Sequence, residues 1–291
     1  MLGLEYVRYL LSRGTIVIML TLLSTSVIGF VISHNEKQEF VGSLATYTED
    51  SPFDLKLLQY AVNSYGDTSF LYNLWFNSDI PLLLVLVIIA WIGIYFVPRM
   101  QIEKRNNFGN LILSRVSFGR RVLDILGAQS LYIMTIIVFY VLITTILAMV
   151  WGGVTPSHLL VEMYGLNRWD VLVVIGLQAI WLSIAVISMN AFAFMADMYI
   201  KNKYILQIIP IIIFVILPML AGTAIGNTFP EVGEILLRYQ PTNLIDALHF
   251  FFQESWDSSH WIWNGAIVWT SFVAFLVLFP FYYLKGRRDY L

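Results

Sequence analysis

The chain has 291 residues, of which 58% are hydrophobic and only 12% charged, whereas a soluble globular domain carries roughly 25% charged residues. Its net charge of −2 says little about nucleic acid, which we do not expect as a partner, and the absence of cysteine excludes disulfides, thiolate metal sites and cysteine nucleophiles. The composition therefore predicts a single transmembrane domain over residues 1–291 rather than a soluble protein.

Residues 1–13 distribute apolar and polar side chains with the period of a helix. This pattern predicts a helix that lies in the cytoplasmic interface of the membrane, and the alternative is a short extension of the first span. The apolar positions near one face are Leu4, Val7, Leu10 and Leu11, and Glu5, Arg8 and Ser12 lie off it.

Six apolar runs follow, each near the ~20 residues that a helix needs to cross the hydrocarbon core. Helices are favoured over barrel strands because the runs do not alternate and because a helix satisfies its own backbone in lipid. We interpret the first run as a span and not a signal peptide, since it has no small-x-small cleavage site. The predicted spans cover residues 15–33, 80–98, 129–151, 171–196, 204–222 and 261–284.

Basic residues set the predicted orientation. Thirteen of the 17 fall in the N-terminal segment, the 99–128 loop, the 197–203 turn and the C-terminal tail. Arginine and lysine near span ends stay on the cytoplasmic side, so we expect both termini in the cytoplasm and segments 34–79 and 223–260 outside. The expected location is the plasma or inner membrane of a bacterial cell.

The segment 99–128 is the only long cytoplasmic connection in this topology. Within it, residues 103–114 can form a short amphipathic helix. A basic loop that only anchors the topology and touches anionic lipid is the alternative interpretation. Its six basic residues are Arg99, Lys104, Arg105, Arg115, Arg120 and Arg121.

In this loop Glu103 is followed by Gly109, a leucine-rich turn, a serine-containing bend with arginines, and Gly127 leading into a span. This order of residues resembles the cytoplasmic loop of ABC-2-type transporter permeases. The bend lacks the proline that is common in the family, and Gln129 stands near the usual lysine. In that family the loop is the coupling helix that docks on the nucleotide-binding subunit. The docking residues that the resemblance implies are Glu103, Phe108, Gly109, Leu111, Leu113, Arg115, Arg120 and Arg121.

The resemblance also implies the rest of the architecture. The fold class is then an all-α membrane protein with an N-terminal interfacial elbow helix and six transmembrane helices, similar to type V exporters. The segment 238–248 looks like the proline-centred segment that ends the family's re-entrant outer helices, so 223–260 would be partly re-entrant.

The phosphate-binding sequence Gly-x-x-x-x-Gly-Lys-Ser/Thr does not occur in the chain. We therefore expect a permease subunit that is not itself an enzyme and has no cofactor of its own. A partner nucleotide-binding ATPase subunit would bind ATP and Mg. A second copy of this chain, or a related permease, would complete the pore.

The spans contain few polar residues and no central charge, which argues against a proton relay. Gln178 and Asn190 are candidates for a translocation path, and interhelical hydrogen bonding is the alternative role. Such an interior suits export of a hydrophobic or amphipathic substrate, with an antimicrobial or amphipathic peptide favoured over a lipid or drug. The four histidines show no ligand spacing, so we expect no metal.

Two function classes compete with the exporter. An ATP-independent channel or secondary carrier would work without a partner ATPase, but it would be expected to carry a buried ionisable residue. An intramembrane enzyme would need a nucleophile and base at matched depth, and the spans show no such pair.

Overall fold

The computed structural model describes residues 2–45, 71, 75, 84, 86–88, 90–91, 93–96, 117–152, 168–196, 199–200, 202–212, 216, 220, 224, 227–232 and 279–284. Within these ranges the chain is helical and has no strand, which confirms the all-α class for this part of the protein. The helices are α1 (Leu2–Leu10), α2 (Arg13–Ala45), α7 (Phe118–Gly152), α9 (Arg168–Ala196) and α10 (Lys203–Ile211).

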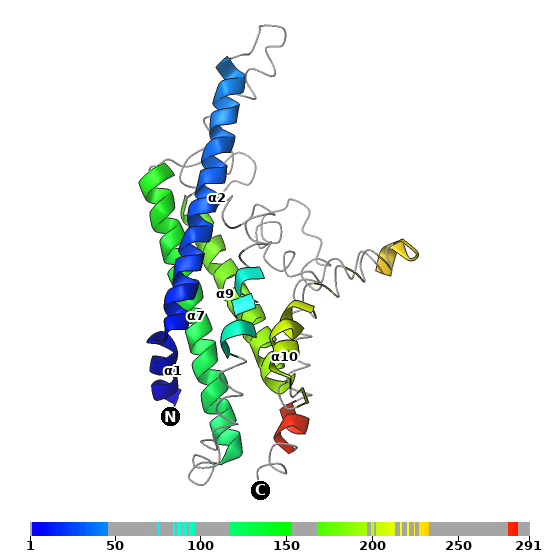
Figure 1. Cartoon of the computed structure of the whole chain (residues 1–291). Helices are drawn as coiled ribbons and strands as arrows, with labels where there is room; N and C mark the ends of the chain where they lie inside the picture. The colour runs from blue at the N-terminus through cyan, green and yellow to red at the C-terminus, as the bar shows by residue number, and fades with distance from the viewer. Residues whose placement is uncertain are drawn as a thin grey trace.

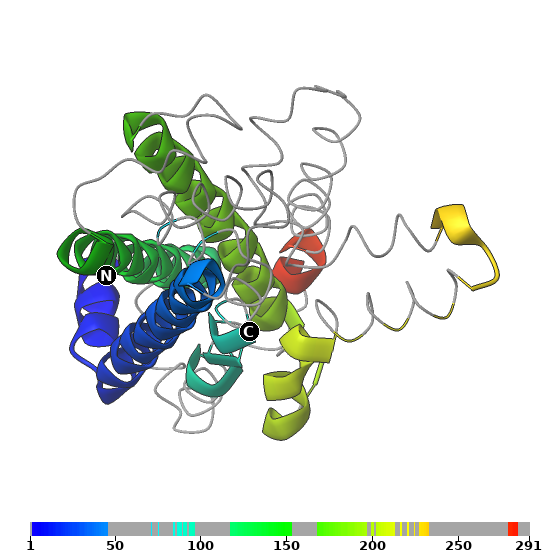
Figure 2. The same cartoon turned by 90° about the horizontal axis from the view of Figure 1, so that it is seen from above.

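Helix α7 is the centre of the described structure, because α1, α2 and α9 all pack against it (Figure 1). Helix α10 packs against α9, and in the view from above segment Leu86–Phe96 lies between α2 and α10 (Figure 2). The segment 279–284 returns to the beginning of α7, where the rings of Phe118 and Tyr282 stack with centroids 6.0 Å apart.

A sharp break at Leu11 and Ser12 separates α1 from α2. The Ser12 hydroxyl oxygen accepts a hydrogen bond from the backbone N–H of Thr15 at 3.3 Å, which caps the start of α2. Helix α2 therefore begins at Arg13, two residues before the predicted span at 15–33. A helix thus lies within predicted segment 1–13, and its place at a membrane interface stays a prediction.

Helix α7 is longer than a membrane crossing requires. Its 35 residues span about 52 Å, against a hydrocarbon core of about 30 Å. The extra length lies at its beginning, since residues 118–128, which the sequence analysis placed in the cytoplasmic loop, form the first turns of the helix. Whatever precedes Phe118 is therefore connected directly to the core of the bundle by one helix.

The exposed side of α7 is as apolar as its buried side. Exposed large hydrophobic residues recur every three or four positions along it, opposite a buried stripe that includes Ile133, Ile137 and Tyr140. Soluble proteins rarely expose such a continuous apolar surface. Two described stretches, Arg13–Ile32 with 20 residues and Phe118–Val150 with 33, are long and apolar enough to cross a membrane. The exposed apolar residues that recur at this spacing on α7 are Leu131, Met134, Val138, Leu142, Ile146 and Val150.

Gly93 allows segment Leu86–Phe96 to pack closely against the backbone of α10. A Cβ at Gly93 would clash with the backbone carbonyl oxygen of Gln207, which cannot rotate away. We expect Gly93→Ala to lower the free energy of unfolding by about 2 kcal/mol, as overpacking does. The measurement is the heat-induced unfolding midpoint of the purified chain in mild detergent.

Gly176→Ala is the matched control for this change. Gly176 lies within α9, and no described neighbour comes within 4 Å of its added Cβ. Alanine there is expected to leave the midpoint unchanged or raise it, because alanine favours the helix. Equal losses in the two variants would contradict close packing at Gly93.

Candidate functional site: a polar core between α1, α7 and α9

Helix α1 turns its polar face toward α7. Glu5, Tyr6 and Tyr9 lie on one side because residues four apart share a helical face. The Glu5 side chain is 12% exposed and Tyr9 is 3% exposed, whereas Leu4 and Leu11 on the opposite side are about four-fifths exposed. The inward face of α1 thus combines Glu5 and two tyrosines with the partly buried Leu10, while Leu4 on the other side is exposed.

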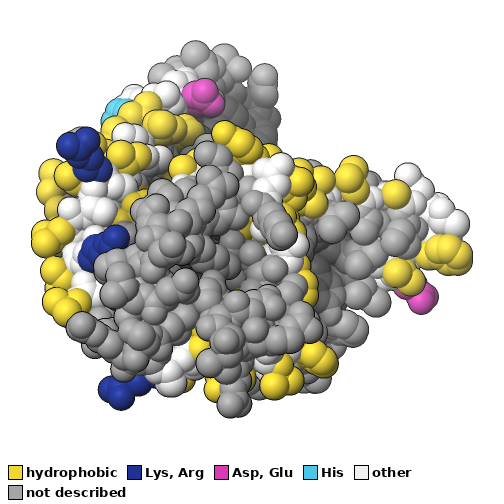
Figure 3. Space-filling view, turned by 60° about the horizontal axis from the view of Figure 1, so that its bottom comes forward, with side chains coloured by type: hydrophobic (Ala, Val, Ile, Leu, Met, Phe, Trp, Pro, Cys, Tyr) yellow, Lys and Arg dark blue, Asp and Glu magenta, His cyan; other side chains and the backbone are white. Residues whose placement is uncertain are grey.

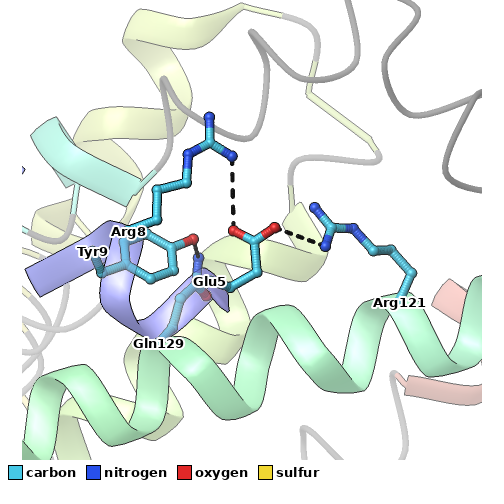
Figure 4. Close-up of polar contacts among 5 residues, drawn as sticks. All are labelled: Glu5, Arg8, Tyr9, Arg121 and Gln129. Atoms are coloured by element: carbon cyan, nitrogen blue, oxygen red, sulfur yellow. Dashed lines mark hydrogen bonds and ion pairs between the residues drawn. The ribbon is translucent and has the colours of Figure 1, made fainter. Parts of the chain in front are cut away.

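Glu5 forms a nearly buried ion pair with Arg121 at the beginning of α7. The Arg121 Nη1 atom lies 2.9 Å from Glu5 Oε1, and the two side chains are 9% and 12% exposed. Arg8 approaches the other carboxylate oxygen of Glu5 at 3.8 Å but is 50% exposed (Figure 4). The Glu5–Arg121 pair therefore carries most of the electrostatic attraction, because exposed pairs are screened by solvent.

Gln129 joins three helices by two hydrogen bonds. Its Nε2 donates to the hydroxyl of Tyr9 in α1 at 3.2 Å (Figure 4). Its Oε1 accepts from Nδ2 of Asn190 in α9 at 2.9 Å. Gln129 is completely buried and Asn190 is 2% exposed. Unpaired amides in an apolar interior are costly, so these two bonds fix the positions of α1 and α9 on α7.

Three further hydrogen bonds hold α1 and the start of α2. The Thr15 hydroxyl donates to the carbonyl oxygen of Tyr9 at 2.6 Å and accepts from the Tyr132 hydroxyl at 2.8 Å. The hydroxyls of Tyr6 and Thr135 lie 2.9 Å apart. Helix α1 is therefore bonded to α7 at several points along its length and cannot shift without disturbing α7.

Five aromatic rings close this core on the side of segment Leu86–Phe96. Trp91 stacks on Tyr95 at 5.1 Å between centroids and lies 5.3 Å from Tyr132. Tyr9 meets Phe96 edge to face at 5.4 Å. Contacts of this kind contribute about 1 kcal/mol each beyond the area they bury. We call the rings and hydrogen-bonded groups together the polar core.

Two of the predicted docking residues, Arg120 and Arg121, lie in the part of the chain that the structure describes. Arg120 is exposed on the first turn of α7, and Arg121 beside it is buried in the pair with Glu5. The other predicted docking residues lie outside the described residues, and they are Glu103, Phe108, Gly109, Leu111, Leu113 and Arg115.

Of the two residues predicted to line a translocation path, the structure describes the side chain of Asn190 and not that of Gln178. Asn190 is buried and bonded to Gln129, so it serves as an interhelical contact in this structure. Gln178 lies in α9, and its side chain is outside the described residues. The sequence analysis named Gln129 only for its departure from the family's lysine, and it missed Glu5 and Tyr9 as partners.

The described residues contain no group of three or more histidine, aspartate and glutamate side chains that could hold a metal. Within the same part of the chain, the polar core consists of arginine, glutamate, amides, hydroxyls and aromatic rings that are used in contacts between helices. These groups are therefore suited to holding α1, α7 and α9 together, so that a movement of one helix moves the others.

Comparison of the chain with protein-family models, with curated proteins and with solved structures finds no match. The class that the fold defines is a helical protein with two stretches able to cross a membrane by length and composition.

Proposed function

We propose that the chain is the membrane-spanning permease subunit of an ATP-binding cassette exporter of the ABC-2 type. It has six spans, both termini in the cytoplasm and α1 as the interfacial elbow helix. It moves a hydrophobic or amphipathic substrate outward, with an amphipathic peptide favoured. A separate nucleotide-binding subunit binds ATP and Mg, and a second permease completes the pore in a bacterial plasma membrane.

The observation that supports this proposal best is the connection of the predicted coupling loop to the polar core. Arg121 is the last of the predicted docking residues and is paired with Glu5, and eight residues further along α7 Gln129 holds both α1 and α9. Because α7 is continuous from Phe118, a displacement of the loop is transmitted to three helices together. A permease driven from the cytoplasmic side needs such a rigid connection.

Because Asn190 is buried, it could line a translocation path only after a change in its surroundings. Its amide is bonded to Gln129, so lining a path would require that bond to break or α9 to move. Gln178, twelve residues earlier in α9, remains a candidate for the path. Opening and closing of the Gln129–Asn190 contact is then a step that ATP-driven movement of α7 would control.

The decisive experiment is purification of the full chain from its native cells in mild detergent. Recovery of an ATPase with a phosphate-binding loop, whose activity depends on this chain, would support the exporter. A chain that purifies alone and conducts ions in vesicles would instead establish the channel or carrier. Transport of lipids or drugs, rather than peptides, would change only the substrate class.

A charge introduced into the coupling loop is expected to detach the ATPase. Gly109→Glu or Arg120→Glu should reduce co-purified ATPase at least tenfold, because either change puts negative charge into a basic docking surface. The amount of chain inserted in the membrane should stay the same. Arg288→Glu makes the same reversal in the predicted cytoplasmic tail and should leave the ATPase bound. Unchanged association in the two loop variants would refute the docking assignment.

A further inference from the structure

Helix α1 exposes one apolar strip, opposite the face on which Leu10 packs against the core, and hides its only carboxylate. Leu4 is 79% exposed, Val7 47% and Leu11 83%, while the Glu5 side chain is 12% exposed in its pair with Arg121. Water would favour the opposite arrangement. A bilayer boundary favours the observed one, because leucine and valine then contact acyl chains at the level of the headgroups.

Basic side chains stand next to this apolar strip. Arg8 is half-exposed and Arg13 is exposed, one on each side of Leu11 in sequence. Among the described residues, Glu5 is the carboxylate near them, and it is shared between Arg8 at 3.8 Å and Arg121 at 2.9 Å. The first turns of α7 carry one further basic residue, Arg120, and one acidic residue, Asp124.

The described residues at this end therefore carry an excess of positive charge around an apolar strip. Figure 3 shows it from the end where α1 lies, with separated basic side chains among hydrophobic ones along one edge. An amphiphile with a negative headgroup matches that surface, whereas a zwitterionic one gains little from the arginines.

We infer that α1 and the first turn of α2 bind an anionic phospholipid, with the acyl chain on Leu4, Val7 and Leu11 and the phosphate at Arg8 and Arg13. This inference rests on the membrane location in the proposed function, but it does not need the partner ATPase. A headgroup held there would contact the same helix that Glu5, Tyr6 and Tyr9 fix to α7. Lipid composition would then influence the polar core directly.

The absence of cysteine makes a site-specific test simple. Leu11→Cys in the full chain is labelled with a fluorophore that bromine quenches, and the protein is reconstituted in phosphatidylcholine vesicles. Brominated phosphatidylglycerol or brominated phosphatidylcholine is added at the same low mole fraction. We expect phosphatidylglycerol to associate at least fivefold more strongly. A label at Leu142→Cys, an exposed residue within α7, should show no preference between the two lipids.

Arginine substitutions test the headgroup contact. Each of Arg8→Gln and Arg13→Gln is expected to reduce the preference at residue 11 about fivefold, since one basic residue near an anionic surface contributes about that factor. Arg120→Gln should preserve it. A preference that persists without Arg8 and Arg13, or that Arg120→Gln removes equally, would overturn the site.

Different outcomes would refute the anionic lipid site and the interfacial position of α1. Equal quenching of the residue 11 label by both brominated lipids would refute the anionic site and leave the membrane location intact. No quenching by either lipid would refute the interfacial position of α1 and, with it, the elbow helix of the proposed permease.

Discussion

Glu5→Gln is expected to lower the free energy of unfolding by about 3 kcal/mol, because it leaves the guanidinium of Arg121 without its carboxylate partner at 2.9 Å in a nearly buried site. The corresponding fall in the unfolding midpoint of the purified chain in mild detergent is roughly 6–12 °C. The neutral amide has almost the volume of the carboxylate, so the loss measures the charge and not a cavity.

Arg8→Gln is the matched control for this prediction. It removes the other guanidinium near Glu5, but that side chain is 50% exposed and 3.8 Å away, so the expected loss is under about 1 kcal/mol. A second check combines Glu5→Gln with Arg121→Met. The double variant should lose less than the sum of the single variants, since removing both charges leaves none uncompensated. Equal losses of unfolding free energy for Arg8→Gln and Glu5→Gln would contradict the claim that the buried Glu5–Arg121 pair contributes more than the exposed Glu5–Arg8 pair.

The ends of the helices show what an apolar pattern can and cannot predict. The apolar stretch of α2 runs from Arg13 to Ile32, close to the predicted span at 15–33. The helix itself begins where Ser12 caps it and continues past the stretch to Ala45, through Glu36, Lys37 and Glu39. Charged residues mark where the apolar run stops, and a helix can continue past that point without lipid around it.

The same reason explains the beginning of α7. Arg120, Arg121 and Asp124 gave residues 118–128 the composition of a loop, although their backbone is helical. Hydropathy reports the surroundings of side chains and not the hydrogen bonding of the backbone. Arg121 is also buried, and that is possible because Glu5 neutralises it.

The polar core could be predicted only in part. The helical face shared by Glu5 and Tyr9 is visible in the sequence. Their partners are not, since Glu5 and Arg121 are 116 residues apart and Tyr9 and Gln129 are 120 apart. Pairing at such separations depends on how helices pack, and one sequence contains no direct record of it.

The interior hydrogen bonds at Gln129 lead to the second large expected effect. Gln129→Leu removes the donor to Tyr9 and the acceptor of the Asn190 amide, both at buried positions. A buried polar group that loses its partner costs about 1–3 kcal/mol, so the two losses together should lower the free energy of unfolding by about 3 kcal/mol. The unfolding midpoint in mild detergent measures this change.

Two variants separate lost hydrogen bonds from altered packing at Gln129. Ser130→Ala removes a neighbouring hydroxyl that bonds only within its own helix, to the carbonyl oxygen of Leu126 at 2.8 Å, and should cost under about 1 kcal/mol. Adding Asn190→Leu to Gln129→Leu should recover part of the loss, because the amide left without its acceptor is then absent. If the double variant is instead less stable than Gln129→Leu alone, packing and not the hydrogen bond to α9 holds the two helices together, and Gln129 would then transmit no movement from α7.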